Sequence, residues 1–296
     1  MSYNGADLIF PQLVIVIPSL PRSITLPIGS GFSIAFYGIV ITFGMFLGLL
    51  LAQKDAKRRG QDPEMYLDLM FWLIVIGVLC ARIYYIVFEW DAYRGDIFKM
   101  INIREGGLAI YGGIIGGCLA AYVFSKRRKV SFLMLMDTVM PAVLVGQILG
   151  RWGNFFNCEA FGGYTDSLFA MRIREALVNP SMISAELAAN RILDGGVSYI
   201  QVHPTFLYES AWNLLSLLFL LWFGKKRQSW TGQIFCLYFL CYGIGRAIIE
   251  GLRTDSLMIP GTPLRVSQCL SVLLALAAAL VLILNRKKPS APDPAA

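Results

Sequence analysis

The chain has 296 residues, of which 56% are apolar and only 15% are charged, and its mean hydropathy is +0.61. This composition excludes a disordered chain, which would carry more charge, and an ordinary soluble domain, which would have a smaller apolar share. The net charge of +7 does not indicate nucleic acid binding, because the basic residues gather in the connections between apolar segments. We therefore expect no nucleic acid partner.

Seven apolar segments have about the 20 residues that a membrane-spanning helix needs. They lie at roughly residues 33–52, 68–88, 107–124, 131–150, 206–224, 232–250 and 264–284. Clusters of lysine and arginine follow alternate segments, at residues 54–59, 126–129, 225–227 and 286–288. Because basic connections stay in the cytoplasm, the sequence predicts an all-α polytopic membrane protein with seven transmembrane helices, its N-terminus outside and its C-terminus inside.

The same segments divide the chain into five parts. Residues 1–32 form an external N-terminal arm, residues 33–150 contain helices 1–4, residues 151–205 form an extracytoplasmic head region, residues 206–285 contain helices 5–7, and residues 286–296 form a cytoplasmic tail. We expect no cleavable signal peptide, because the apolar stretch Leu8 to Leu20 follows no basic region and contains two prolines. We interpret that stretch as lying along the membrane surface, and residues 184–193 of the head as a short helix.

Charged side chains inside apolar segments need a partner or a function, because each costs about 3 kcal/mol or more in a bilayer. Arg82 lies in the second segment, Arg151 ends the fourth, and Arg246 and Glu250 lie in the sixth. Arg246 and Glu250 are four residues apart on one helical face, and Tyr242 precedes them by another four. A self-neutralising structural ion pair and a catalytic site are both open explanations of this face.

The fourth segment ends in GRWGNFFNCEAFG, residues 150–162. Arg151, Asn154 and Glu159 meet there among glycines at a helix end. The planar fork of an arginine fits a phosphate and an asparagine amide can donate to its oxygens, while glycine lets the backbone approach closely. A lipid phosphate is the anion to expect at this depth. A second polar cluster, HPTFLYE at residues 203–209, opens the fifth segment from the same side.

Glycine pairs surround Tyr111 at the start of the third segment, at residues 106–107, 112–113 and 116–117. Small residues four positions apart are typical of closely packed helices. A glycine-lined groove that admits acyl chains is the alternative, with Tyr111 at its outer end.

The cysteines and the histidine give little sign of a metal or a covalent intermediate. Five of the six cysteines lie in apolar segments, where small buried side chains are the usual interpretation, and only Cys158 lies outside one. His203 is the only histidine, which excludes a multi-histidine metal site and leaves one possible centre for a serine–histidine triad. We expect no metal.

Four stretches together resemble bacterial phosphatidylglycerol–prolipoprotein diacylglyceryl transferases. They are GLAIYGG at residues 107–113, the stretch at 150–162, the stretch at 203–209, and YGIGRAIIE at 242–250. The resemblance runs from about Phe36 to the seventh segment and implies a multi-pass enzyme of the bacterial cytoplasmic membrane. It implies transfer of the sn-1,2-diacylglyceryl group from phosphatidylglycerol to the lipobox cysteine of a preprolipoprotein signal peptide, with release of glycerol phosphate and without a cofactor.

The resemblance also assigns residues. It makes Arg151 the phosphatidylglycerol-binding arginine and Arg246 a second essential arginine. It matches required positions with Tyr37, Asn154 and Gly162, and supporting positions with Glu159, Tyr208, Glu209, Tyr242 and Glu250. We add His203 to the substrate-binding candidates because it belongs to the polar cluster at residues 203–209. Some members have a histidine, considered a catalytic base, where this chain has Tyr111; tyrosine also occurs there, so Tyr111 is a catalytic candidate whose role as a base is open.

The chemistry agrees with this assignment. When a thiolate attacks the glyceryl carbon bonded to the phosphate oxygen, the departing phosphate needs stabilisation of its charge more than a proton. Arginines supply that, and cationic neighbours also favour the thiolate. A different phospholipid-dependent transferase and a transporter are the alternatives, although a transporter commonly shows internal repeats and polar lining through both leaflets. A structural membrane protein would explain the glycine spacing but not the polar clusters.

Overall fold

The computed structural model describes residues 5–27, 32–103 and 106–286, and the chain divides into two compact units. The first unit consists of Met1–Gly48 and Met140–Ala291, and the second contains Leu49–Val139. Two long helices, α1 (Phe36–Arg58) and α6 (Phe132–Asn157), pass from one unit to the other.

Six helices of the described residues are long and apolar enough to cross a membrane, so the chain is an integral membrane protein. They are α1, α2 (Glu64–Phe88), α6, α8 (Thr205–Lys226), α9 (Gln233–Ile249) with the turn η4 (Glu250–Leu252), and α10 (Val266–Leu284). The third segment predicted from the sequence forms α5 (Ile110–Arg127). This helix is not among the six, because its 18 residues include four glycines, Lys126 and Arg127, which lower its hydropathy.

Glycines bring the helices of the first unit close together. A Cβ on Gly243 of α9 would lie 2.6 Å from the carbonyl oxygen of Ser271 on α10. A Cβ on Gly245 would lie 2.1 Å from the ring of Trp212 on α8, whose Nε1 donates to the Cys241 carbonyl over 2.8 Å. Small residues therefore set the contacts of α9 with both neighbours, as is usual for helices in membranes.

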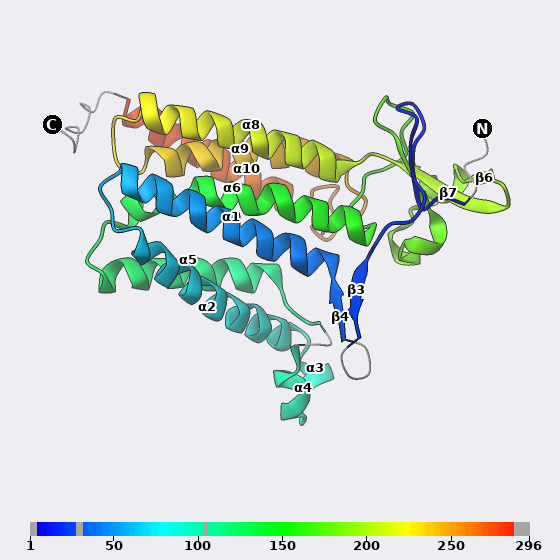
Figure 1. Ribbon diagram of the computed structural model, residues 1–296, viewed down its shortest axis with the longest axis horizontal. Coiled ribbons are helices and arrows are strands. Elements are labelled where there is room, and N and C mark those ends of the chain that lie inside the picture. Colours follow the sequence, from blue (N-terminus) through cyan, green and yellow to red (C-terminus); the bar gives the residue numbers. More distant parts are fainter. Residues whose placement is uncertain (1–4, 28–31, 104–105, 287–296) are drawn as a thin grey trace. The chain divides into compact units, whose positions relative to one another are not determined.

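A five-stranded antiparallel sheet forms the head region of the first unit, beyond the ends of α6 and α8 (Figure 1). Its order is β2-β1-β5-β7-β6. The strands are β1 (Leu8–Phe10), β2 (Ile15–Ile17), β5 (Met171–Arg174), β6 (Ile192–Asp194) and β7 (Val197–Val202). Leu8 of β1 lies opposite Ile173 of β5, and Met171 lies opposite Val202 of β7. β7 leads through two residues into α8, so the sheet holds the outer end of that helix.

The prediction of an all-α chain is therefore wrong for the head region, although the structure is mostly helical. The interpretation of Leu8 to Leu20 as a surface segment is wrong for Leu8, Ile9 and Phe10, whose side chains are buried. Leu8 and Ile173 lie in one apolar core with Phe155 at the end of α6 and Phe206 at the start of α8. The N-terminal arm thus completes the core that carries these two helix ends.

Shorter elements fill the rest of the head. A two-stranded ribbon of β3 (Ser23–Leu26) and β4 (Phe32–Ala35) leads into α1. The 3-10 turns η2 (Glu175–Leu177) and η3 (Pro180–Met182) precede α7 (Ala185–Ala189). α7 confirms a helix within residues 184–193 but is shorter than predicted. Ser184 caps its start, accepting from the Leu187 amide over 3.3 Å, and β6 begins soon after its end.

In the second unit, α2 and α5 pack closely through the glycines of α5. A Cβ on Gly112 would lie 2.5 Å from the carbonyl oxygen of Cys80, and one on Gly116 would lie 2.6 Å from the Cys80 Cβ. α2 therefore fills the space beside both glycines. The packing interpretation is confirmed there, and the alternative of a groove for acyl chains is wrong for these two positions.

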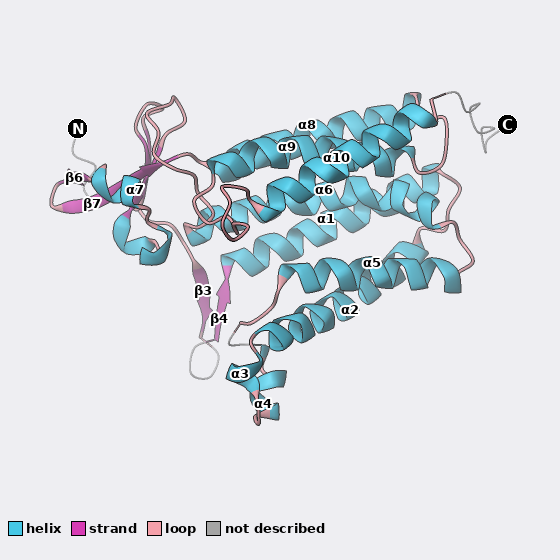
Figure 2. Cartoon of the chain, turned by 180° about the vertical axis from the view of Figure 1, so that it is seen from behind, coloured by secondary structure: helices cyan, strands magenta, loops and turns pink. Residues whose placement is uncertain are grey.

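Among the described residues, the hydrogen-bond partners of Arg82 on α2 are backbone carbonyls and not an acid. Its guanidinium donates to the carbonyl oxygens of five residues, over 2.7–3.0 Å, all in the segment that follows α2: Lys99, Met100, Asn102, Gly106 and Gly107. This segment includes the short helices α3 (Trp90–Tyr93) and α4 (Ile97–Ile101), seen at the end of α2 in Figure 2. Arg82 is buried and organises that segment.

Candidate functional site

The site is built on the end of α6, where the backbone leaves the helix abruptly. α6 ends at Asn157 because Cys158 adopts a left-handed conformation, with φ +52°, and Ala160 does so again with φ +55°. Each costs about 1 kcal/mol for a residue with a side chain. The Glu159 amide donates to the Asn154 carbonyl over 3.1 Å, which closes the last turn. Strain of this kind gathers at functional sites.

Gly162 joins this loop to two other parts of the first unit. Its amide donates to the His203 carbonyl over 3.0 Å, and the next amide, of Gly163, donates to the Leu252 carbonyl over 2.9 Å. A Cβ on Gly162 would lie 2.7 Å from the His203 Cβ and 2.8 Å from the Leu252 oxygen. Only glycine fits here, so Gly162 brings the ends of α6 and η4 against the start of α8.

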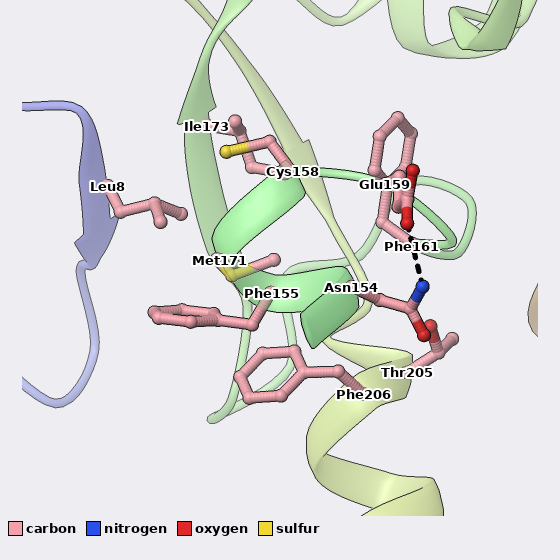
Figure 3. A pocket seen from close by; sticks show the side chains of 10 residues that line it. All are labelled: Leu8, Asn154, Phe155, Cys158, Glu159, Phe161, Met171, Ile173, Thr205 and Phe206. Atoms are coloured by element: carbon pink, nitrogen blue, oxygen red, sulfur yellow. Dashed lines mark hydrogen bonds between the residues drawn. The ribbon is translucent and has the colours of Figure 1, made fainter. Parts of the chain in front are cut away.

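Figure 3 shows a small cavity beneath the loop, lined on one side by Asn154, Glu159, Phe161 and Thr205 and on the other by further apolar side chains. Its volume is about 10 Å³, which is room for about one water molecule, too small for a lipid or a peptide group. Cys158 also lines it, is only 3% exposed, and has its thiol pKa raised by burial. These properties disfavour a nucleophilic role for Cys158.

Three arginines from different elements meet at one carboxylate beside this loop. Glu209 on α8 is 4% exposed, and its Oε2 lies 2.8 Å from Nε of Arg151 on α6. Its Oε1 lies 3.1 Å from Nη1 of Arg246 on α9 and 3.6 Å from Nη1 of Arg253, just after η4. We call these four residues the arginine cluster. Through these ion pairs the buried carboxylate holds the three guanidinium groups in place.

Glu250 supplies a second carboxylate at the same place. Its Oε2 lies 2.6 Å from Nη2 of Arg246, so the predicted ion pair between these residues is confirmed. Arg246 also pairs with Glu209, however, so the pair is not self-contained. Ser267 on α10 donates to Oε1 of Glu250, and Arg265 donates to its backbone carbonyl. Glu250 thus ties the arginine cluster to α10.

Asn154 connects the cluster to the loop of α6. Nη1 of Arg151 donates to Oδ1 of Asn154 over 3.1 Å, and Nδ2 of Asn154 donates to Oε1 of Glu159 over 2.9 Å. Asn157 donates to the same Glu159 oxygen over 3.3 Å. Arg151, Asn154 and Glu159, which the sequence placed in one motif, therefore form a continuous hydrogen-bonded chain.

The remaining sequence candidates lie on or next to α1, α5, α8 and α9. The Tyr37 ring packs against Gly153, where a Cβ would lie 2.5 Å from its Cδ2. Tyr242 stacks on Tyr238 with ring centroids 5.7 Å apart. Nδ1 of His203 lies 3.4 Å from the Tyr208 hydroxyl, and burial lowers the pKa of His203. Tyr111 lies on the first turn of α5, in the second unit, and is half-buried.

Sequence reasoning missed Arg253. It lies three residues after Glu250, one helical turn away, and this spacing is the signal that could have found it. Its guanidinium also donates to both oxygens of Asp255, over 2.9 and 2.7 Å. Burial alone would raise the pKa of Asp255, but the hydrogen bonds and charge of Arg253 lower it overall. Among the described residues, three carboxylates therefore pair directly with the three arginines of the site, those of Glu209, Glu250 and Asp255.

This arrangement suits the recognition of an oxyanion. Guanidinium groups present paired donors that match phosphate and carboxylate oxygens, and the side chains of Arg151, Arg246 and Arg253 are 21%, 14% and 11% exposed. In such a partly desolvated site, the arginines stabilise a negative charge that develops during a reaction more than they would in water.

Comparison with known proteins agrees with the motifs. The sequence model of the prolipoprotein diacylglyceryl transferase family matches residues 23–284. Proteins named phosphatidylglycerol–prolipoprotein diacylglyceryl transferase are similar over most of their length: one from Listeria welshimeri, 41% identical over 88% of this chain and 88% of its own, and one from Bacillus cereus, 41% identical over 93% and 96%. A third, from Halalkalibacterium halodurans, is 40% identical over 87% and 84%. The chain belongs to the prolipoprotein diacylglyceryl transferase family.

Proposed function

We propose that this protein transfers the sn-1,2-diacylglyceryl group of phosphatidylglycerol to the lipobox cysteine of preprolipoproteins and releases glycerol phosphate. The observation that carries the proposal is the arginine cluster, built on family motifs at the ends of three membrane-spanning helices. Lipid phosphates lie at such helix ends, while acyl chains extend into the bilayer. The names of the similar proteins give phosphatidylglycerol and prolipoprotein as the substrates of a diacylglyceryl transfer.

The reaction forms one carbon–sulfur bond and breaks one carbon–oxygen bond. The thiolate attacks the glyceryl carbon that is esterified to phosphate, and the phosphate leaves with the bonding electron pair. Arg151 and Arg246 stabilise the leaving phosphate because they hold donors where negative charge develops. Asn154 orients Arg151 through its 3.1 Å hydrogen bond. Direct transfer needs no covalent enzyme intermediate, which agrees with the buried state of Cys158.

The other candidates take supporting roles in this proposal. Gly162 joins the elements of the site, and Tyr37, Glu159, Glu250 and Tyr242 shape the surroundings of the two arginines. His203 and Tyr208 form a contact at the start of α8. For Tyr111 we propose a hydrogen-bonding role that its hydroxyl provides and that an imidazole can partly replace. No metal or cofactor takes part.

We further propose seven membrane crossings, with α5 as the crossing beyond the six helices that hydropathy identifies. The basic connections then lie in the cytoplasm, the N-terminus and residues 151–205 outside, and the C-terminus inside. The external arm, the outer head and the cytoplasmic tail keep the boundaries inferred from the sequence. The membrane is the cytoplasmic membrane of a bacterium.

The reaction is tested by incubating the purified protein with phosphatidylglycerol and a synthetic lipobox peptide. Mass spectrometry is expected to find a diacylglyceryl thioether on the peptide, together with free glycerol phosphate. A peptide with serine in place of the cysteine and a reaction with phosphatidylethanolamine serve as controls. A product that lacks the thioether would favour another phospholipid-dependent transferase, and lipid movement without any product would favour a transporter.

A further inference from the structure

Glu209 is the one carboxylate among the described residues that pairs with all three arginines of the site. Its two oxygens lie 2.8–3.6 Å from nitrogens of Arg151, Arg246 and Arg253, and its side chain is 5% exposed. The carboxylate thus already occupies a position among guanidinium donors that suits a phosphate oxygen, because both anions accept charge-assisted hydrogen bonds of about 2.7–2.9 Å.

The charge balance of the site means that a lipid phosphate must compete with a carboxylate for the arginines. Glu209, Glu250 and Asp255 supply three negative charges to three arginines. The phosphodiester of a lipid adds a fourth, and a group that is already neutral attracts it less than a group with an unpaired guanidinium. A phosphate gains its full set of contacts when a carboxylate gives up some of its own.

Glu209 is the carboxylate best suited to yield. Glu250 also accepts from Ser267, and Asp255 is held on both oxygens by Arg253. The hydrogen bonds and ion pairs of the Glu209 carboxylate within the described chain are all made with arginines. Its contacts are therefore the ones that an incoming phosphate can replace directly.

We propose that Glu209 is a positioning residue that competes with the lipid phosphate for the three arginines of the cluster. It aligns the guanidiniums before lipid binds, gives up part of its contacts to the phosphate, and takes them back when glycerol phosphate leaves. Glu209 thereby sets a moderate affinity for the anion, which permits product release. The inference rests on the proposed function, in which these arginines bind phosphate.

The test separates affinity from turnover in the purified full-length protein in detergent micelles. Glu209→Gln keeps the shape of the side chain and removes the competing charge. We expect the Kd of a fluorescent phosphatidylglycerol and the inhibition constant of glycerol 1-phosphate to fall by about tenfold, while kcat falls at least as much. A residue with a merely structural role would weaken lipid binding when replaced.

Glu209→Asp keeps the charge but withdraws the carboxylate by one methylene. We expect an intermediate result, with a Kd about two- to threefold below that of the wild type and a kcat reduced about tenfold. Glu175→Gln is the matched control, because Glu175 pairs with Arg191 in the head region and lies outside the site. It is expected to leave both constants unchanged.

An unchanged or higher Kd for phosphatidylglycerol in a folded Glu209 variant would overturn the competition, and a wild-type kcat for Glu209→Asp would overturn the positioning role. If Glu209→Gln does not fold, the Kd of Glu209→Asp for phosphatidylglycerol decides whether the carboxylate competes with the phosphate. The wild-type protein is assayed for thioether formation in parallel. Failure of that reaction refutes the proposed function, whereas unchanged affinities with an active wild type refute only the role of Glu209.

Discussion

Arg151 uses different atoms of its guanidinium for different partners, which makes its shape as important as its charge. Nε faces Glu209 at 2.8 Å while Nη1 donates to Asn154 over 3.1 Å. A lysine has one nitrogen and cannot reproduce both directions. We expect Arg151→Lys, assayed by thioether formation, to lose activity by roughly 100-fold or more while the protein still inserts into the membrane and is purified in folded form.

Arg174→Lys is the matched control for that substitution. Arg174 lies in the head region, pairs with Asp7 at 3.7 Å, and has a side chain that is 41% exposed. Exposed ion pairs contribute little, so activity is expected to stay at the wild-type level. Substantial activity of Arg151→Lys would show that charge alone suffices at this position.

Gly153 and Gly150 offer a comparison within a single helix. A Cβ on Gly153 would lie 2.5 Å from the Tyr37 ring, whereas nothing lies within 4 Å of a Cβ on Gly150. Gly153→Ala is therefore expected to displace Tyr37 and reduce transfer about tenfold or more. Gly150→Ala is expected to keep full activity and to stabilise α6 slightly, because alanine is the better helix former by up to about 1 kcal/mol. Equal activities of the two variants would remove the argument for close packing at Tyr37.

His203 makes stability depend on pH in a simple way, since it is the only histidine. Burial lowers the pKa of His203 in the folded protein, so the folded state binds a proton less readily than the unfolded state. Its contribution to stability is complete above the unfolded pKa of about 6.5 and is lost as the pH falls through the lower folded value. Thermal unfolding measured between about pH 5 and pH 8 should show a lower midpoint at acidic pH. His203→Asn should lack that part of the dependence, and an identical dependence in the variant would assign it to other groups.

At the scale of elements, the membrane helices were predictable and the head was not. Long apolar runs report a spanning helix directly, and α1, α2, α6, α8, α9 and α10 lie where such runs occur. The strands β1 and β2 have only three residues each, too few for a recognisable alternation. β1 also pairs with β5, more than 160 residues later in the chain, a contact that no local pattern announces.

The candidate site, too, was predictable from the sequence only in part. Arg151, Asn154 and Glu159 share one motif, and their hydrogen-bonded chain follows from it. The meeting of Arg151 with Glu209 joins α6 to α8, which depends on how these helices pack and is not written in either motif. Arg253 was missed because it follows the end of the sixth apolar segment, where an arginine is ordinarily expected to lie exposed in a loop.

Arg82 shows how one side chain supports a whole segment. Within the described residues, its hydrogen bonds go to the carbonyls of Lys99, Met100, Asn102, Gly106 and Gly107, over 2.7–3.0 Å. Arg82→Lys can satisfy only some of them and should lose the other hydrogen bonds, at a cost of about 1 kcal/mol each. We expect faster proteolysis of the segment after α2 and a lower unfolding midpoint. Arg128→Lys is the control, because Arg128 pairs with Asp68 at an exposed place; equal losses in both variants would contradict the role of Arg82.

At the scale of the whole molecule, the topology depends on α5. Its 18 residues include four glycines and end in Lys126 and Arg127, so hydropathy alone does not identify it as a crossing. Its close contacts with α2 explain how a weakly apolar helix can be accommodated, because packing against a neighbour replaces contact with lipid along one face. The basic residues that follow α5 match the other basic connections only if α5 crosses the membrane.

Fusions to reporters after single connections test this topology. If α5 crosses, a green fluorescent protein is expected to fluoresce when fused after residue 128, 227 or 286, because those sites are cytoplasmic. Alkaline phosphatase, active only outside, is expected to work after residue 103 or 195.

If α5 does not cross, residues 103 and 128 must lie on the same side of the membrane. Every later connection must then change sides, since the number of crossings before it falls by one. Phosphatase activity after residues 128 and 286 would thus contradict the seven crossings. Our proposal places the arginine cluster at the outer ends of α6, α8 and α9, and this result would place it on the cytoplasmic side instead.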